Sequence, residues 1–269
     1  MMDMKRRCVL ITGAYGGMGL ATARRLAADG YTVFALDKSV GEGEEYIIPV
    51  QADVTDTASI QAAFEKVCKE TDSLFAIIHF AGVYMLDSLV EMSDQDFDRI
   101  FKINVYGAFY INKTFMPLLK KGSRILLTTS ELAPLDPLPF TGIYAITKSA
   151  LDKYAYSLRM ELQLLGVDVS VLRAGAVSTG MLGVSTAALD RFCARTKTYQ
   201  CNAKQFKKVV DGVESKCISP EKIAQKAAEI LQKRKPKFHY SINRNKLLLL
   251  LNALPKRLQC FAIRQILKG

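Results

Sequence analysis

The residues best suited to chemistry in this sequence are a tyrosine and a lysine spaced four positions apart, Tyr144 and Lys148. At this spacing the two side chains share one face of a helix. A free tyrosine titrates near pH ~10, and a neighbouring ammonium favours the phenolate and so lowers the pKa. Ser130 ends an apolar run fourteen residues upstream of Tyr144 and could donate a hydrogen bond to the same substrate oxygen. The three side chains predict proton transfer to or from an alcohol or carbonyl.

Taken alone, such a pair is more often an ordinary exposed pair on a helix, but the N-terminal segment favours the catalytic interpretation. An apolar segment typical of a buried strand, residues 7–12, is followed by the glycine-rich turn 13–19 and by the helical composition of residues 20–30. Strand, glycine turn and helix form the dinucleotide fingerprint, in which glycines let the backbone approach a pyrophosphate at the helix N-terminus. Asp37 ends the next predicted strand, where an acid grips a ribose 2′-hydroxyl.

Together these motifs resemble those of the short-chain dehydrogenase/reductase family, and the resemblance covers nearly the whole chain. It implies a catalytic tetrad, which matches Asn104, Ser130, Tyr144 and Lys148. It also implies a nicotinamide-dinucleotide site, in which Asp53 and Val54 contact adenine. The expected cofactor contacts are Gly13, Tyr15, Gly16, Gly17, Met18, Gly19, Asp37, Asp53, Val54, Ala81, Gly82, Tyr144, Lys148, Gly175, Val177 and Thr179.

Two positions depart from the family pattern. His79 stands where the family usually has an asparagine, and we interpret it as a hydrogen-bonded core histidine and not as a catalytic one. Ala174 replaces the usual proline before Gly175, which loosens the turn over the nicotinamide. Neither change removes a group that carries chemistry.

The resemblance implies a mechanism in which Tyr144 exchanges a proton with the substrate oxygen while hydride passes between the carbinol carbon and the nicotinamide. Lys148 is expected to lower the tyrosine pKa and bind the nicotinamide ribose, and Asn104 to hold a water that links Lys148 to solvent. The pocket walls on either side are mostly apolar, which predicts a hydrophobic alcohol or ketone. The expected substrate contacts are Ser130, Leu132, Leu138, Tyr144 and Met181.

The basic tail and the long 180–217 insert resemble the hydroxysteroid and retinol dehydrogenase branch, which implies a hydroxysteroid, bile-acid-like or retinoid substrate. Arg191, Arg195 and Lys197 could meet an anionic group such as a bile-acid carboxylate. One alternative is a 3-oxoacyl-thioester reductase. Another, from a different class, is a cofactor-binding regulator that has kept the fold without turnover.

The cofactor is predicted to be NAD, with NADP as the less favoured alternative. The carboxylate of Asp37 can accept hydrogen bonds from both ribose hydroxyls, and it would repel a 2′-phosphate. Gly16 occupies a position where NADP-preferring relatives often carry a basic residue. Lys38 follows the acid and is expected to turn into solvent.

Strand-like and helical segments alternate along the chain, which predicts a single-domain Rossmann-type α/β fold: a doubly wound parallel sheet with helices on both faces. A chain of 269 residues with 49% hydrophobic content can bury a sizeable core. Residues 1–242 are expected to form the dinucleotide-binding catalytic domain, with a substrate-loop insert at about 180–217, and 243–269 a basic, apolar C-terminal extension. Strands are expected at 7–12, 31–37, 46–51, 74–80, 123–128 and 168–173, and helices at 57–70, 93–113, 142–165 and from 219.

Most of the positive charge lies near the C-terminus. The formal net charge is +11, and residues 233–269 contain ten lysines and arginines and no acidic residue. The same segment holds a run of leucines far shorter than the ~20 residues of a bilayer span. Such a tail suits an anionic membrane surface; the alternative, which we favour, is a tail packed on its own domain or on a partner subunit. Nucleic-acid binding is not expected, since no stacking motif accompanies the charge.

The cysteines and histidines do not indicate a metal centre. Six cysteines without a C-x-x-C pair and two histidines predict neither zinc nor a disulfide framework. A reducing cytoplasm fits this pattern, with peripheral membrane contact as the further option. A strand that begins at Arg7 leaves no room for a signal peptide. The family resemblance implies a homo-oligomer, either a dimer or a tetramer.

Overall fold

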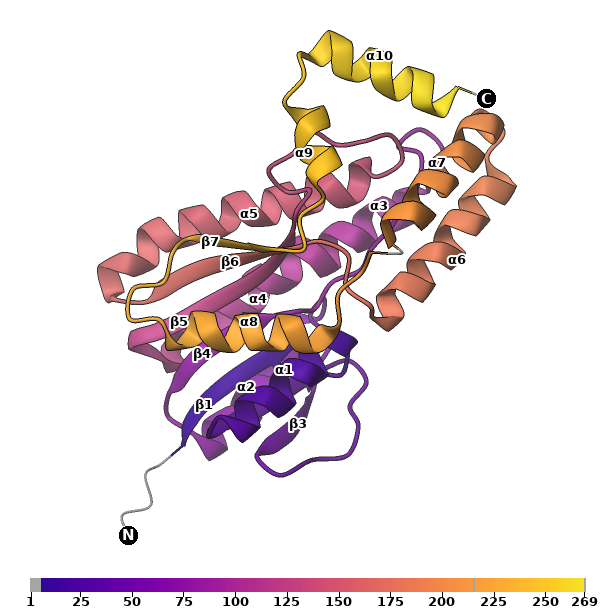
Figure 1. Cartoon of the computed structure of the whole chain (residues 1–269). Coiled ribbons are helices and arrows are strands. Elements are labelled where there is room, and N and C mark those ends of the chain that lie inside the picture. Colours follow the sequence, from indigo (N-terminus) through magenta and orange to yellow (C-terminus); the bar gives the residue numbers. More distant parts are fainter. Residues whose placement is uncertain (1–5, 215, 269) are drawn as a thin grey trace.

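A computed structural model describes residues 6–214 and 216–268, and within them it leaves the side chains of 181–186, 213 and 214 undescribed. Its centre is a parallel sheet (Figure 1) with the strand order β3-β2-β1-β4-β5-β6-β7. The strands are β1 (Arg7–Thr12), β2 (Tyr31–Asp37), β3 (Ile47–Gln51), β4 (Leu74–His79), β5 (Leu119–Ser130), β6 (Asp168–Ala174) and β7 (His239–Ile242). Because all strands run the same way, their carboxyl ends meet at one edge of the sheet.

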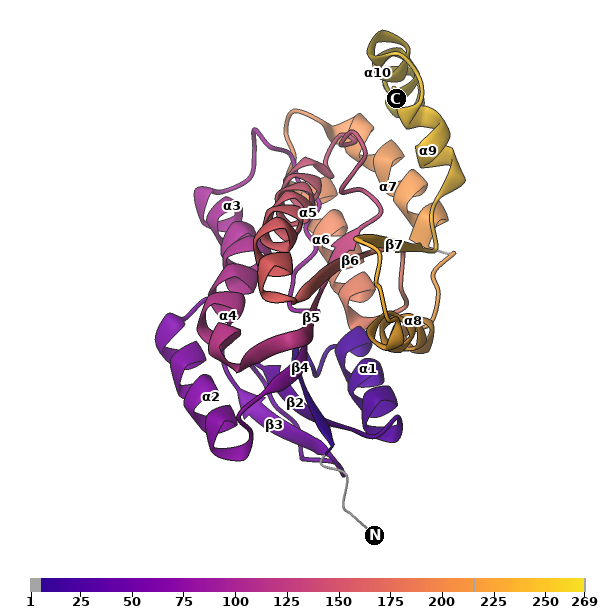
Figure 2. The ribbon, with the colours of Figure 1, turned by 90° about the vertical axis from the view of Figure 1, so that its left-hand side faces the viewer.

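Two helical layers cover the sheet, as Figure 2 shows. On one face α1 (Gly17–Ala28) packs beside α8 (Pro220–Gln232), with Leu26 and Ile223 fully buried between them and the strands. On the other face lie α2 (Thr57–Glu70), α4 (Gly107–Phe115) and α5 (Gly142–Leu162), whose buried side chains share a second core cluster. The predicted doubly wound α/β fold is therefore confirmed.

Local sequence signals account for several helix starts. The Asp56 carboxylate accepts the N–H of Ala58 at 2.9 Å and caps α2. Ser93 caps α3 (Asp94–Phe101) by accepting the N–H of Asp96. The long helix predicted from Ser93 is interrupted by a π-helical turn, η1 (Lys102–Tyr106), before α4 begins. A π turn inside a helix commonly marks a functional position.

Three parts of the chain were not predicted as defined elements: the 180–217 insert, the strand β7 and the C-terminal segment. The 180–217 insert contains two helices, α6 (Gly180–Arg195) and α7 (Gln200–Glu214), which pack against each other. After β7, the C-terminal segment forms α9 (Lys246–Asn252) and α10 (Lys256–Leu267). α10 packs on α7, where Leu267 is buried and its carbonyl accepts the Asn202 side-chain N–H at 2.6 Å. Single-turn helices η2 (Met116–Leu118) and η3 (Gln163–Leu165) complete the described elements.

Candidate active site

Ser130, Tyr144 and Lys148 converge at the carboxyl edge of the sheet. Ser130 is the last residue of β5, and the other two lie one turn apart near the start of α5. All three line one pocket, together with Thr128, whose carbonyl accepts the Lys148 Nζ at 3.2 Å. Tyr144 and Ser130 are joined by a side-chain hydrogen bond. The phenol of Tyr144, the hydroxyl of Ser130 and the amine of Lys148 therefore meet around one space, as the sequence spacing predicted.

Asn104 braces this group from the π-helical turn. Its Oδ1 accepts the backbone N–H of Val83 at 2.8 Å, and its Nδ2 donates to Val83 O at 3.0 Å and to Thr147 Oγ1 at 3.1 Å. Thr147 in turn donates to the carbonyl of Tyr144 at 2.8 Å. Asn104 therefore ties the segment after β4 to the first turn of α5, which fixes where Tyr144 and Lys148 point.

Burial sets the protonation of the pair, and it opposes the expected direction for the tyrosine. Removal from water raises the pKa of Tyr144 to about 12, although the hydrogen bond with Ser130 lowers it in part. Burial also lowers the pKa of Lys148 to about 8. The expectation that the lysine lowers the tyrosine pKa is not met by the protein alone, because the ammonium, 5.7 Å from the ring centroid, turns toward the Thr128 carbonyl. Additional positive charge near the phenol is needed to favour the phenolate.

The backbone of the glycine turn between β1 and α1 is packed so closely that several of its glycines have no room for a side chain. Gly13 has φ +66°, and a Cβ there would lie 2.6 Å from Ala81 N. A Cβ on Gly19 would lie 2.1 Å from Gly13 O, and one on Gly17 2.9 Å from Thr179 Cγ2. The first helical bond of α1 runs from Leu20 N to Gly16 O, so the N–H groups of its first turn face outward without helical partners. These features fit a dinucleotide pyrophosphate.

Asp37 sits at the end of β2 beside this turn. Its Oδ2 accepts the backbone N–H of Tyr15 at 2.9 Å, which fixes the carboxylate next to the glycine turn. The Lys38 side chain extends into solvent as expected and is 77% exposed. Its Nζ pairs with Asp53 at 2.9 Å, and this contact, with help from Thr55, lowers the pKa of Asp53 to about 2. The Lys38 charge is thus directed at Asp53, on the neighbouring strand end.

Most of the expected cofactor contacts line one continuous groove along this edge of the sheet, whereas Gly17 and Gly19 lie in the closely packed glycine turn and line neither pocket. One pocket contains Gly13, Tyr15, Gly16, Asp37, Asp53, Val54, Ala81 and Gly82, and an adjoining pocket contains Met18, Gly82, Tyr144, Lys148, Gly175, Val177 and Thr179. Phe80, Gly82 and Val83 belong to both, so the pockets join. We call this groove the trough; its first end lies at Asp37 and its second end at Tyr144.

The second end of the trough is a largely apolar pocket. Of the expected substrate contacts, Ser130, Leu132, Leu138 and Tyr144 line it, whereas the side chain of Met181 lies outside the described residues. Sequence reasoning missed Phe206, Val209 and Val210 of α7, and Leu248 of α9. The apolar spacing 206, 209, 210 is that of one helix face and could have revealed the first three. Leu248 was hidden within a leucine run assigned to the tail.

A buried carboxylate joins this pocket to the C-terminal segment. Glu131, the neighbour of Ser130, is 8% exposed, and burial raises its pKa. Its Oε2 accepts the backbone N–H of Asn245 at 2.6 Å, directly before α9. Arg244 lies close enough for its charge to lower that pKa in part. Glu131 therefore anchors the start of α9 beside Ser130.

His79 and Ala174, the two departures from the family pattern, both fit their surroundings in the structure. His79 is buried, its Nε2 lies 2.9 Å from Asn112 Oδ1, and burial lowers its pKa to about 4, as expected of a neutral core histidine. Ala174 ends β6, and its carbonyl accepts the N–H of Glu131 at 3.0 Å. Neither position disturbs the convergence of Ser130, Tyr144 and Lys148 on one pocket.

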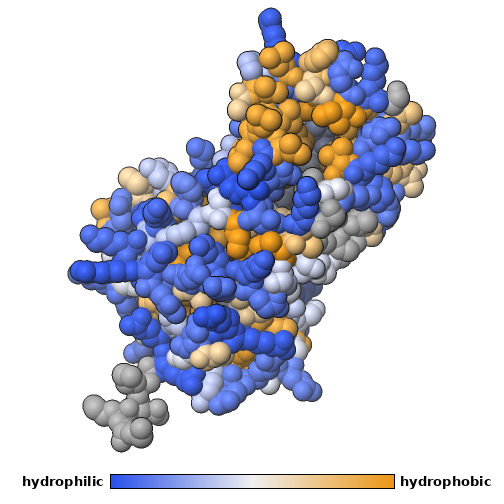
Figure 3. All heavy atoms as spheres, viewed as in Figure 1, coloured by the Kyte–Doolittle hydropathy of each residue, from blue (hydrophilic) through white to orange (hydrophobic). Residues whose placement is uncertain are grey.

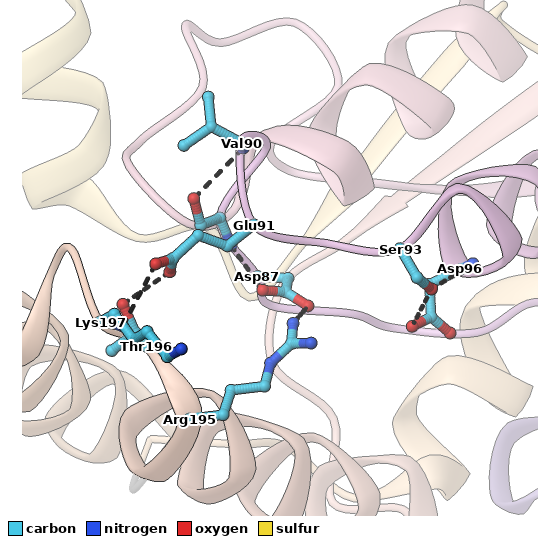
Figure 4. A network of polar contacts seen from close by, with 9 residues as sticks. Asp87, Val90, Glu91, Ser93, Asp96, Arg195, Thr196 and Lys197 are labelled. Carbon is cyan, nitrogen blue, oxygen red and sulfur yellow. Dashed lines mark hydrogen bonds and ion pairs between the residues drawn. The ribbon is translucent and has the colours of Figure 1, made fainter.

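Of the three cations expected to meet an anionic substrate group, Arg195 forms an ion pair outside the pocket. Arg195 pairs with the buried Asp87, as Figure 4 shows. Glu91 accepts the Thr196 hydroxyl at 2.6 Å and the backbone N–H groups of Lys197 and Thr198. These contacts fasten the end of α6 to the segment after β4, and the Arg195 guanidinium is thereby directed at Asp87 and not at the pocket. We call them the α6 clasp.

Comparison with known proteins identifies the family that the sequence motifs resemble. A family profile described as short chain dehydrogenase matches residues 7–190. Estradiol 17-beta-dehydrogenase 2 of Mus musculus is 32% identical over 197 residues, which cover 68% of this chain and 51% of that protein. The chain thus spans about half the length of this relative. The 3-ketodihydrosphingosine reductase of Bacteroides thetaiotaomicron is 22% identical over 89% of this chain and 88% of its own length.

Solved structures agree at the level of the fold. A 3-ketoacyl-(acyl-carrier-protein) reductase from Brucella melitensis in complex with NADH has a TM-score of 0.72 and 21% identity, and covers 88% of this chain and 96% of its own. An alcohol dehydrogenase from Thermococcus sibiricus in complex with 5-hydroxy-NADP has the same TM-score and 22% identity, with 90% and 100% covered. Both nicotinamide cofactors therefore occur among structures with this fold.

Proposed function

Because the chain belongs to the short-chain dehydrogenase family of NAD(P)-dependent alcohol and ketone oxidoreductases, we propose that it interconverts a hydrophobic secondary alcohol and its ketone with NAD. The substrate class proposed is a hydroxysteroid, bile-acid-like molecule or retinoid. One observation carries the proposal: Ser130, Tyr144 and Lys148 meet at the inner end of a pocket whose other walls are largely apolar. The similarity to an estradiol dehydrogenase supports the steroid option.

A bound nicotinamide supplies the hydride acceptor in oxidation and the hydride donor in reduction. In oxidation, the Tyr144 oxygen takes the hydroxyl proton as the carbinol C–H bond breaks, and the Ser130 hydroxyl holds the substrate oxygen. Reduction returns the proton from Tyr144 to that oxygen. Lys148 would stabilise the phenolate electrostatically, and an oxidised nicotinamide bound in the trough would add positive charge.

The proton leaves through the side of the site that faces Asn104. A Cβ on Gly82 would lie 3.3 Å from Asn104 Oδ1 and 3.5 Å from Lys148 Nζ, so both atoms border one small space above this glycine. One lone pair of Oδ1 is used by Val83, which leaves another to accept a water hydrogen bond. We assign this space to the water that links Lys148 to solvent.

The preference for NAD rests on Asp37. Its carboxylate is held at the first end of the trough by Tyr15 N, where it suits two ribose hydroxyls and opposes a 2′-phosphate. Because Lys38 pairs with Asp53, its positive charge offsets little of the repulsion between Asp37 and a 2′-phosphate.

The main rival function is reduction of a 3-oxoacyl thioester. The likeness to a carrier-protein reductase is a likeness of fold, and the apolar pocket would also accept an acyl chain. A cofactor-binding regulator without turnover is the rival from another class. Homo-oligomerisation, a cytoplasmic location and contact of the tail with an anionic membrane are further parts of the proposal. No helix in the described part of the chain is both long and apolar enough to span a bilayer.

The deciding experiment is a substrate panel followed at the nicotinamide absorbance. Steroids, bile acids, retinoids and acetoacetyl thioesters are each offered with NAD(H) and with NADP(H). Turnover of a steroid, bile acid or retinoid with NAD supports the proposal, and a thioester preference overturns the substrate class. Cofactor binding without turnover of any alcohol or ketone favours the regulator.

A further inference from the structure

The two C-terminal helices carry hydrophobic side chains on their outer surface. In α9, Leu247 and Leu250 are 73% and 66% exposed, and in α10, Leu258, Phe261 and Ile266 are 55%, 61% and 56% exposed. Figure 3 shows hydrophobic side chains gathered over this end of the molecule. Single exposed apolar residues are ordinary, but a group of them on adjoining elements marks a binding surface. We call these five residues the outer face.

Cations without carboxylate partners lie beside the outer face. At 100° per residue, Arg257 and Arg264 project from the same side of α10 as Phe261, and Lys268 follows directly after the end of the helix. Lys246 is likewise adjacent to Leu250 on α9. Among the described residues no acidic side chain pairs with any of these four cations, whereas Lys256, on another side of α10, pairs with Asp136. The surface thus combines apolar side chains with unpaired positive charge.

The inner side of the same segment belongs to the catalytic pocket. Leu248 of α9 lines that pocket, as does Val209 of α7, which is 40% exposed and therefore stands at its mouth. Glu131, beside Ser130, holds Asn245 at the start of α9. One short helix therefore faces the pocket with one side and solvent with the other.

We propose that the outer face docks on an anionic lipid bilayer, and that the pocket mouth then receives its substrate from the lipid phase. The second part rests on the proposed function and names its substrate as a lipid-dissolved alcohol or ketone. The long side chains of lysine and arginine can reach lipid phosphates while the apolar residues enter the interface. A second copy of this chain is a poorer occupant, because a two-fold contact would bring two sets of unpaired cations together.

Docking is tested without turnover, by co-sedimentation with phosphatidylcholine vesicles that contain or lack phosphatidylserine. Wild-type protein is expected to bind the anionic vesicles and to be released by high salt. Phe261→Glu is expected to weaken this binding at least about tenfold, since it removes an apolar contact and adds a like charge to the lipid. Leu164→Glu, at a position 83% exposed on η3, is the matched control and should bind as wild type does.

Entry of the substrate from the lipid phase is tested by comparing turnover of a ketone dissolved in anionic vesicles with turnover of a water-soluble ketone. Phe261→Glu should lose the rate advantage with the vesicle-borne substrate and keep wild-type kcat/KM for the soluble one. Docking with no such advantage overturns the delivery route alone and leaves the oxidoreductase function standing.

Other outcomes overturn docking itself. If wild-type protein ignores anionic vesicles at low salt, or binds neutral and anionic vesicles equally, the outer face is not an anionic-membrane surface. If Phe261→Glu instead converts a dimer into a monomer in sedimentation velocity, the occupant is a second copy of the chain.

Discussion

The two ends of the trough are built in different ways. At the Asp37 end, much of the site is backbone: a glycine turn held by close contacts and amides without helical partners. Beside it, the Asp37 carboxylate is fixed by Tyr15 N. At the Tyr144 end, the walls are side chains from α5, α7 and α9, brought together from distant parts of the chain. Backbone geometry leaves little freedom for change, whereas side-chain walls can vary without disturbing the sheet. We therefore expect the first end to select the cofactor and the second end to select the substrate.

The largest expected effect lies at the second end. Tyr144→Phe removes the transferable proton and leaves the ring in place, so turnover should fall by ~10²–10⁴-fold. Cofactor affinity, measured by nicotinamide fluorescence, should stay nearly unchanged because Asp37 and the glycine turn are untouched. A variant that retains more than about a tenth of the wild-type rate contradicts the role of Tyr144.

The buried ammonium of Lys148 is expected to lower the free energy of unfolding while it serves the proposed reaction. Burial lowers its pKa from 10.5 to about 8, which corresponds to a cost of about 3 kcal/mol at neutral pH. Below pH 8 both states carry the proton and the cost is fully present. Between pH 8 and 10.5 the folded state releases its proton while the unfolded state keeps it, so this cost disappears as pH rises.

Lys148→Met should therefore unfold at higher urea concentration than wild type at pH 7, while its activity collapses. The gap between the two proteins should narrow as pH rises toward 10. A variant less stable than wild type at pH 7 would show that the bond to the Thr128 carbonyl outweighs the cost of burial. Thr57→Ala, on the exposed start of α2, serves as a distant control.

The Asp37 end is tested by cofactor preference. Asp37→Ala should lower kcat/KM with NAD by about tenfold to a hundredfold, because hydrogen bonds to a charged group contribute ~1.5–3 kcal/mol. Activity with NADP should rise or hold, since the repulsion of the 2′-phosphate is gone. A wild type that already prefers NADP would refute Asp37 as the ribose-binding acid.

The smallest effect is expected at the α6 clasp, far from the reacting atoms. Arg195→Met leaves Asp87 buried without its ion pair and should loosen α6. KM for a large apolar substrate should then rise by a few-fold, while NAD affinity stays the same. Arg191→Met, on the same helix and exposed, is the matched control. Equal changes in NAD affinity would show that the two ends are coupled.

The protonation of Tyr144, at the second end of the trough, is expected to depend on the cofactor bound along it. In the protein alone, burial raises the pKa of Tyr144 to about 12, so an ultraviolet titration should show this phenol neutral at pH 9. At saturating NAD, the pH profile of kcat/KM for the alcohol should contain a group titrating below that value, since the oxidised ring adds positive charge. If this group also titrates near 12, cofactor charge and Lys148 do not activate the tyrosine.

The sequence by itself predicted the doubly wound sheet and the residues along the trough. Alternating apolar segments, the glycine turn and the Tyr–Lys spacing are local patterns, and Asp56 and Ser93 signal helix starts through their own neighbouring amides. Strand ends of a parallel sheet meet at one edge, so residues such as Ser130 and Asp37 could be assigned to it before any contact was known.

Only the tertiary structure decided what depends on distant pairs. Lys38 meets Asp53, Arg195 meets Asp87, and Glu131 holds Asn245 across 114 positions of sequence. It placed Leu248 in the pocket wall while its neighbours Leu247 and Leu250 face outward. It also reversed the direction expected for the tyrosine pKa, because burial is a property of everything packed around a group and no local spacing records it.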